Sequence, residues 1–428
     1  MQEKQIVPLT YFQRHRMVDA ALDTETPDRF HALFSQSWAI RFKPGLSLRK
    51  VQRAFANLTQ RHDMLRMRVV EYDGDWAGEI LSEHAAGLVV EDHGPMSKDA
   101  QEKIVAKICA ERITALDPVL FDMRLLRFGS EGDVLVGRGQ HIIYDAYSVG
   151  IILVEMISYL LNIPVVGRTI SHRDFIAYRD RQMTEREEEK RIYWEGSLLP
   201  KAPPLNVGRQ KKGLPPIDRY NMGDTNLLEP ILTPAVSAHV KQVFERTGIS
   251  ANAQIQAAFG DAVCALGDGT EAMWCSMLGR QDAKLAGYVG PAMMGLIIRY
   301  AAGGGAQKIT DLTSRGAAHL PSAVLNPGNS LTRMNYQFFV NMPKPVGRLA
   351  NSPLRKVLDI AEGDGFSLGP IQIERVPTGV GLENDMELEL NIYPSADAPN
   401  AGLMSDATSW DMSELEELAA TMNDLIMS

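Results

Sequence analysis

The chain has 428 residues and a net charge of −9, and 45% of its residues are hydrophobic. These values are typical of a soluble globular protein with more than one hydrophobic core, at roughly 150 residues per domain. The negative charge disfavours a nucleic-acid partner, because phosphate binding needs a dense basic surface.

Cysteine spacing and the first residues indicate the compartment. Cys109, Cys264 and Cys275 show no CxxC spacing and no nearby histidine pattern, so we expect reduced core thiols and no metal site. The opening MQEKQIVPLTYFQRHRM lacks the apolar segment of a signal peptide. We therefore expect a cytoplasmic protein.

The first structural unit is expected to be a helix that leads into a strand. Ser47 is a candidate helix cap, and apolar residues then recur at helical spacing as far as Leu58. Strand chemistry begins at Leu65 in RHDMLRMRVVEY. A second amphipathic helix is expected over 101–115, and a second strand over 120–128.

Residues 133–162 read as a strand followed by a helix. Alternation places Leu135, Gly137, Gly139 and His141 on one strand face, with the strand turning at Tyr144. Glycines inside a strand often mark close approach to the backbone, so they suggest a channel that ends at the imidazole. The alternative is a packed histidine above a bulge.

The helix expected over 147–161 is apolar on nearly every side, which is typical of a core helix. It is too short, and interrupted by Glu155, to span a bilayer, so we expect no membrane segment. Asp145 lies where this helix begins and has the chemistry of an N-cap.

The middle of the chain changes character twice. Residues 171–199 predict a long, charged helical segment, and its charges are expected to be solvated. Residues 200–216 are rich in proline and have no periodicity, which favours a linker. We therefore expect domains over 1–199 and 218–428, joined by a linker over 200–217.

The second half repeats the order of helix and strand. Helices are expected from Thr233 to Gly248 and from Ser250 to Gly267, because each begins at a capping residue and ends at glycine. Strands are expected over 272–278, after Gly290, from Met334 and from Met386, and a last helix over 413–426. The glycines at 303–305 predict a loop, not a phosphate cradle.

Several stretches resemble the condensation domains of nonribosomal peptide synthetases, within the chloramphenicol acetyltransferase-like superfamily. The central motif of that family, HHxxxDGxS, is similar to QHIIYDAYS, which runs from Gln140 to Ser148. The resemblance also covers, in chain order, Thr10, Gln13 and Arg16; Arg61 to Arg66; His172 in HRDFIAY; Gly279 and Arg280; the stretch that ends at Arg299; and Asn335 to Gln337.

The resemblance implies an α/β fold: two acetyltransferase-like subdomains arranged as a V-shaped pseudo-dimer with a central tunnel. It implies that His141 is the catalytic residue. Asp145 would pair with Arg280 to hold the shape of the site, with Gln140 in support. Further candidates for the substrate channel are Gly139, Ala146, Ser148 and Asn335; Ser148 is either a donor in the channel or a residue of the helix surface.

The implied reaction joins an acyl thioester on the phosphopantetheine of a carrier protein to an amine or alcohol. We expect the carrier protein to act in trans, because no adenylation or carrier domain follows in the sequence, and we expect no bound cofactor. A neutral imidazole is suited to take a proton from the attacking group. Such chemistry belongs to antibiotic and natural-product biosynthesis. The carrier-docking surface is open; Arg209, Lys211 and Lys212 could meet an acidic carrier or lie in a solvated linker.

Two departures from the family pattern leave alternatives open. Gln140 stands where the family has its first histidine, and we expect its side chain to form hydrogen bonds away from the channel. Ala146 replaces a glycine and would be strained if the position needs a positive φ. The alternatives are an acyltransferase that uses acyl-CoA, with a small alcohol or amine as acceptor, and a catalytically silent module that recruits another protein.

Overall fold

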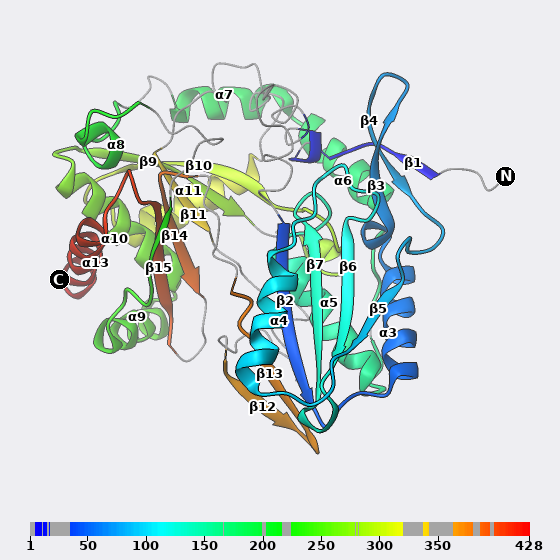
Figure 1. Ribbon diagram of the computed structural model, residues 1–428. Helices are drawn as coiled ribbons and strands as arrows, with labels where there is room; N and C mark the ends of the chain where they lie inside the picture. Colours follow the sequence, from blue (N-terminus) through cyan, green and yellow to red (C-terminus); the bar gives the residue numbers. More distant parts are fainter. Residues whose placement is uncertain are drawn as a thin grey trace. The chain divides into compact units, whose positions relative to one another are not determined.

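The computed structural model describes residues 5–10, 12–14, 17, 35–165, 167–198, 203–215, 224–278, 280, 282–319, 337–341, 363–379, 386–393 and 398–428. They form two compact units, each of mixed α/β structure as predicted (Figure 1). Unit 1 contains the described residues up to Tyr178, Asp282–Ala292 and residues 363–379. Unit 2 contains the other described residues.

Unit 1 is built on a mixed sheet and a smaller antiparallel one. Among the described residues, the larger sheet has six strands in the order β12 (Gly365–Leu368), β13 (Ile371–Arg375), β2 (Ser35–Lys43), β7 (Asp133–Gln140), β6 (Phe121–Arg127) and β5 (Leu88–Asp92). Only β5 and β6 pair in parallel among these described strands. The smaller sheet has the order β1 (Gln5–Val7), β4 (Asp75–Ile80) and β3 (Met67–Tyr72).

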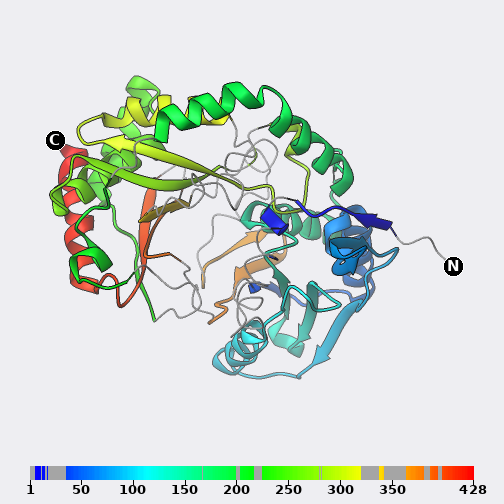
Figure 2. The ribbon, with the colours of Figure 1, turned by 90° about the horizontal axis from the view of Figure 1, so that it is seen from above.

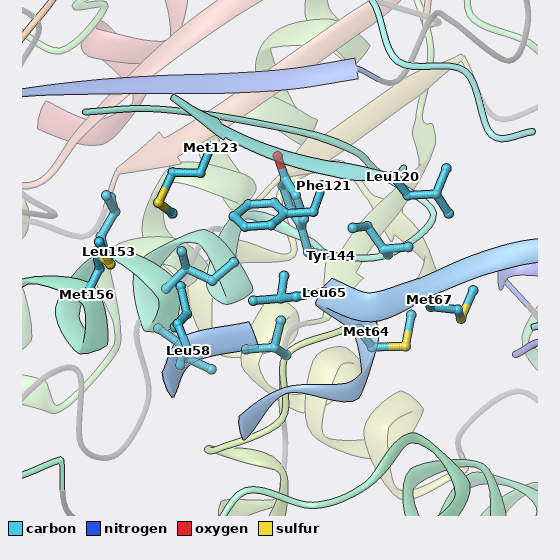
Figure 3. Packing of buried hydrophobic residues seen from close by; sticks show 14 of the residues in the cluster. Leu58, Met64, Leu65, Met67, Leu120, Phe121, Met123, Tyr144, Leu153 and Met156 are labelled. Atoms are coloured by element: carbon cyan, nitrogen blue, oxygen red, sulfur yellow. The ribbon is translucent and has the colours of Figure 1, made fainter. Parts of the chain in front are cut away.

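Helices cover both faces of the larger sheet of unit 1. On one face, α3 (Leu48–Arg61) and α5 (Ala146–Leu160) join Leu135 in a hydrophobic cluster (Figure 1). Figure 3 shows its interior, where the edge of the Tyr144 ring meets Phe121. On the other face, α4 (Lys98–Ala110) packs against Val134 and Val136. Strand β7 is therefore buried on both faces.

Unit 2 has its own sheet and hydrophobic core. In the part that the structure describes, the strand order is β10 (Met294–Ala301), β9 (Glu271–Leu278), β11 (Phe338–Asn341), β14 (Leu388–Tyr393), β15 (Asn400–Asp406) and β8 (Thr225–Leu228). The helices are α7 (Glu187–Leu198), α8 (Gly208–Lys211), α9 (Pro234–Thr247), α10 (Ala251–Leu266), α11 (Gly305–Ala318) and α13 (Met412–Met427). Figure 2 shows α13, in red, along one side of this sheet.

The remaining elements are short or lie at the division between the units. Helix α6 (His172–Thr184) is separate from α7, and Arg186 between them has φ 54°. The expected single helical segment over 171–199 is therefore two helices. Three 3-10 turns complete the described elements: η1 (Asp63–Arg66), η2 (Gly129–Glu131) and η3 (Ala283–Leu285).

Helices marked by local signals were predicted well. The Thr233 and Ser250 side chains cap α9 and α10, and Gly248 ends α9 with φ 77°. Helix α13 begins with a capping box formed by Asp411 and Glu414. Ser47 occupies the N-cap position of α3, but its side chain makes no capping hydrogen bond. Local capping chemistry thus located both ends of α9 and of α10.

The division into units differs from the predicted domains. The expected C-terminal domain supplies β13, in which Gln372 lies opposite Lys43 of β2 in unit 1. The expected linker is also partly packed: Leu205 and Val207 are buried in the core of unit 2. Long-range strand pairing leaves no local signal in the sequence, so β2 and β13 were not predicted.

The glycine floor on β7 is a packing feature, which corrects the expected channel. Added at Gly137, a Cβ atom would overlap the Trp38 ring, and at Gly139 it would overlap the Tyr144 ring. Both rings lie almost entirely out of contact with solvent. Glycine is needed because two large aromatic rings lie against the strand, so substrate does not occupy this space.

We predict that Gly139→Ala lowers the free energy of unfolding by about 1 to 3 kcal/mol, because the new methyl group displaces the buried Tyr144 ring. Gly196→Ala is the matched control: Gly196 lies inside α7, and no atom lies within 4 Å of the added Cβ. That variant should gain about 0.5 to 1 kcal/mol from helix propensity. Urea unfolding measures both, and equal stability of the two variants would contradict the packing role.

Candidate active site

The chain turns directly after β7. The strand ends at Gln140, and the Ile143 N–H donates to the Gln140 carbonyl at 3.0 Å. His141 is the first residue of this turn and is half-buried. The strand was expected to run to Ile143 and to turn at Tyr144, so its end was predicted three residues too late. Strand alternation therefore does not set the direction of the imidazole.

The N-terminal motif holds this turn. The Gln13 side chain, which is fully buried, donates from Nε2 to the Ile142 carbonyl at 2.7 Å. Its Oε1 accepts the Thr10 N–H at 2.8 Å. Phe12 lies next to Gln13 in the same helical turn, and its ring centroid is 5.5 Å from that of His141. Arg16, the third residue of this motif, lies outside the described residues.

Asp145 is the centre of a buried network in unit 1. Its Oδ1 accepts the Ser148 N–H at 2.8 Å, which caps α5, and the Ser148 hydroxyl at 2.7 Å. Its Oδ2 accepts the Ala292 N–H at 3.1 Å. Ser148 Oγ in turn accepts the Gly290 N–H at 3.0 Å. The network joins the start of α5 to residues 290–292, which are more than a hundred positions later in the chain.

Two predicted site residues have unexpected surroundings. Ser148 is completely buried, so it is not a residue of the helix surface. Ala146 is the first residue of α5 and has no positive φ. The strain expected from replacing glycine at position 146 is therefore absent, because a helical first turn accepts alanine readily.

Gln140 is buried and forms hydrogen bonds with its side chain. Its Nε2 donates to the Ile113 carbonyl at 3.1 Å, and its Oε1 accepts the Ile142 N–H at 3.3 Å. It follows Arg138 in strand alternation, and Arg138 contacts α4 through the Ile108 carbonyl. The amide therefore supports the turn from the α4 face of the sheet.

The remaining predicted residues are not placed together by the structure. Arg280 is buried in unit 2, and its pairing with Asp145 stays a prediction. Asn335 lies outside the described residues. The channel role of Gly139 does not agree with the aromatic ring that covers it.

The RHDMLR motif supports α5 rather than adding chemistry. Glu155 of α5 accepts from Arg61 Nε at 3.1 Å and lies 2.9 Å from His62 Nε2. Arg66 donates from Nε to the Thr59 carbonyl at 2.9 Å and pairs with Asp63. The contacts around Glu155 and around Arg66 are largely buried, so the motif holds α3 against α5.

The basic residues at 209–212 are not a free surface cluster. Arg209 donates to Asp406, which is buried, at 3.2 Å. Lys212 pairs with Glu414 at 2.7 Å, and Lys211 and Lys212 are both exposed. Arg209 and Lys212 thus form ion pairs within unit 2, and a carrier-docking role for this cluster stays a prediction.

His172, at the start of α6, contacts both Tyr288 and Pro8, which directly follows β1. Its Nδ1 lies 2.7 Å from the Tyr288 hydroxyl, and its Nε2 lies 3.2 Å from the Pro8 carbonyl. Tyr288 also stacks on Phe175 with ring centroids 4.1 Å apart. Burial lowers the pKa of His172 to about 4 from its ordinary value of 6.5. The neutral ring donates one hydrogen bond and accepts another.

The described site thus has a half-buried imidazole directly after a central strand, followed by a helix that is capped by a buried aspartate. The condensation domain family matches residues 3–313, which is most of the chain. The chain therefore belongs to the condensation domain family, as predicted.

The chain is also similar to individual proteins of known sequence or structure. A linear gramicidin synthase of Brevibacillus parabrevis is 28% identical over 210 residues, which cover 46% of this chain and 4% of that protein. The chain thus spans only a small part of this curated relative. Two solved structures share the fold, each at 15% identity. The X-domain in complex with OxyB from teicoplanin biosynthesis has a TM-score of 0.74 and covers 100% of this chain and 95% of that chain. The SgcC5 protein from Streptomyces globisporus has a TM-score of 0.71 and covers 98% of both chains.

Metal-binding and membrane-spanning features are absent from the described residues. Within those ranges, no group of three or more His, Cys, Asp or Glu side chains is arranged to hold a metal ion. Across the same part of the chain, no helix has the length and apolar character needed to cross a bilayer.

Sequence reasoning missed Phe12 and the 290–292 peptide groups. Phe12 lies inside the opening motif, but no local pattern indicates that its ring meets His141. The contacts of Gly290 and Ala292 with Ser148 and Asp145 span 142 and 147 positions. Only the folded chain brings these groups together.

We predict that acid destabilises the protein partly through His172. Between pH 6.5 and 4 the unfolded chain binds a proton that the buried ring refuses, so stability falls as the pH falls. The expected loss from pH 7 to pH 5 is about 2 kcal/mol for this group. His172→Gln keeps a donor and an acceptor without the titration, so its loss on acidification should be smaller by that amount.

Urea unfolding at the two pH values measures this difference. His239→Gln is the matched control, because His239 is half-exposed on α9. An unchanged pH dependence in His172→Gln would show that the buried ring is not the acid-sensitive group.

Proposed function

We propose that the protein transfers an acyl group from the phosphopantetheine thioester of a carrier protein to an amine or alcohol acceptor. The observation that carries the proposal is His141, a half-buried imidazole at the end of the central strand, on a turn fixed by the buried Gln13. Condensation domains work with carrier-protein domains, and the relative reported above is a peptide synthetase. The carrier protein, the acyl thioester and the amine or alcohol acceptor are all part of what we propose.

The proposed step needs one proton acceptor and one leaving group. The acceptor nitrogen or oxygen attacks the thioester carbonyl carbon while His141 takes the proton that the attacking atom loses. A C–N or C–O bond forms, the C–S bond breaks, and the proton passes to the departing thiolate to give the free thiol. General-base assistance of this kind is worth about 10² to 10⁴ in rate.

Asp145 is a positioning residue in this proposal. Its carboxylate already accepts from three groups, the Ser148 N–H, the Ser148 hydroxyl and the Ala292 N–H. A carboxylate that is buried in this way is stabilised in its charged form. It is therefore suited to fix the start of α5, just beyond the turn that carries His141, and poorly suited to exchange protons itself.

We predict that His141→Ala lowers turnover by about 10² to 10⁴-fold, because no other group replaces the proton acceptor. The assay combines an acyl-loaded carrier protein in trans with an amine or alcohol, and mass spectrometry follows the product and the deacylated carrier. His239→Ala, on α9 of unit 2, is the matched control and should keep full turnover. Unchanged turnover in His141→Ala, with an unchanged unfolding midpoint, would contradict the general-base role.

The same assay separates the other candidate functions. Faster turnover with acyl-CoA than with the acyl carrier would identify an acyltransferase that uses CoA. The recruitment role has one specific support, the X-domain solved in complex with OxyB, which has this fold. Absence of product with every donor, together with stoichiometric binding to another biosynthetic protein, would favour recruitment. Ala146 gives no support to it, because its backbone is unstrained.

A further inference from the structure

The direction of the His141 ring is set by something other than its own strand. Strand β7 ends one residue earlier, and the carbonyl of Gln140 accepts a turn hydrogen bond from Ile143. The second side-chain torsion of histidine has a broad energy profile, so the ring rotates easily unless a neighbour restricts it. A general base must nevertheless lie within hydrogen-bond distance of one particular proton. A neighbour that restricts the ring is therefore required.

Phe12 is such a neighbour. Its ring centroid lies 5.5 Å from that of His141, and the two ring planes are tilted by 42°. This separation lies within the range of direct aromatic contact. Because the two rings are this close, Phe12 restricts rotation of the imidazole toward it.

Gln13 fixes Phe12 in this position. The Gln13 amide joins Ile142, the residue after His141, and its Oε1 accepts from the Thr10 N–H. The Gln13 N–H also donates to Thr10 Oγ1 at 3.2 Å. The Gln13 side chain thus forms one hydrogen bond within its own helical turn and one to the turn that carries His141. These hydrogen bonds fix the backbone of Phe12 relative to the backbone of His141.

We propose that Phe12 is a positioning residue that fixes the orientation of the His141 imidazole for proton transfer. This inference rests on the proposed acyl transfer. Phe12 touches the base and not the reacting atoms, so its loss affects the chemical step rather than the binding of the acceptor. A misplaced reacting group can cost up to about 100-fold in rate, and partial loss of orientation costs less.

Four variants test this role by steady-state kinetics. Phe12→Ala should lower kcat about tenfold and leave the KM for the acceptor within about twofold, because the base is still present but poorly aimed. Phe12→Leu fills the space without an aromatic ring, and Phe12→Tyr should retain kcat within about twofold. Phe244→Ala is the matched control, because Phe244 is 51% exposed on α9 of unit 2, and it should match the unchanged protein.

A spectroscopic measurement tests the contact without any turnover. With histidine labelled by ¹³C in the ring, the His141 signal is identified as the one that His141→Ala removes. The ring current of Phe12 shifts that signal, so Phe12→Leu should move it while Phe244→Ala leaves it in place. If Phe12 packs only against other residues, the His141 signal will not move selectively, and the contact on which the proposal rests is disproved.

The two measurements fail in different ways. If the unaltered protein makes no product with any donor, the proposed function fails, and the labelled ring still reports whether Phe12 contacts His141. If product forms but Phe12→Ala retains full kcat, or the His141 signal is the same in Phe12→Leu, the positioning role of Phe12 is overturned. A rise in KM with unchanged kcat would also overturn it, because Phe12 would then bind substrate.

Discussion

The buried carboxylate of Asp145 is the constraint on which this site depends. A charged group removed from water is tolerated only where hydrogen-bond donors replace the water. Here the donors come from Ser148, one helical turn ahead, and from Ala292, far along the chain. Satisfying one carboxylate therefore fixes where α5 begins and where the 290–292 segment lies in unit 1. Loss of activity on changing Asp145 would for this reason report on shape as well as on chemistry.

His141 is supported from a different direction. The Gln13 amide forms a hydrogen bond to its turn, and its ring contacts the ring of Phe12. Gln13 and Phe12 both lie among the first residues of the chain. The backbone that precedes α5 is thus fixed at two places, at Ile142 by the N-terminal motif and at Asp145 by the 290–292 segment. Between these points the turn has little freedom, which suits the proton transfer that we propose for His141.

Structural features that depend on neighbouring residues could be predicted from the sequence. Features that depend on contacts between distant residues could not. The caps at Thr233 and Ser250 and the N-cap at Asp145 are local hydrogen bonds, and each was visible as a residue type at a helix start. The family resemblance located His141, although not the end of its strand. Gly139 was misread because the ring that fills its open face belongs to Tyr144, beyond the turn. Strand β13 was missed because its partner lies more than three hundred residues earlier.

Gln140 stands where the family pattern has a histidine, and the hydrogen bonds that the two side chains can form explain why glutamine fits there. A neutral imidazole offers one donor and one acceptor, and the glutamine amide offers both kinds of group as well. In this chain the donor reaches the Ile113 carbonyl and the acceptor receives the Ile142 N–H. Ile142 is then held twice, through its N–H by Gln140 and through its carbonyl by Gln13. Because the position next to His141 needs these two hydrogen bonds rather than a charge, an amide keeps the turn in place without adding a second titratable ring beside the first.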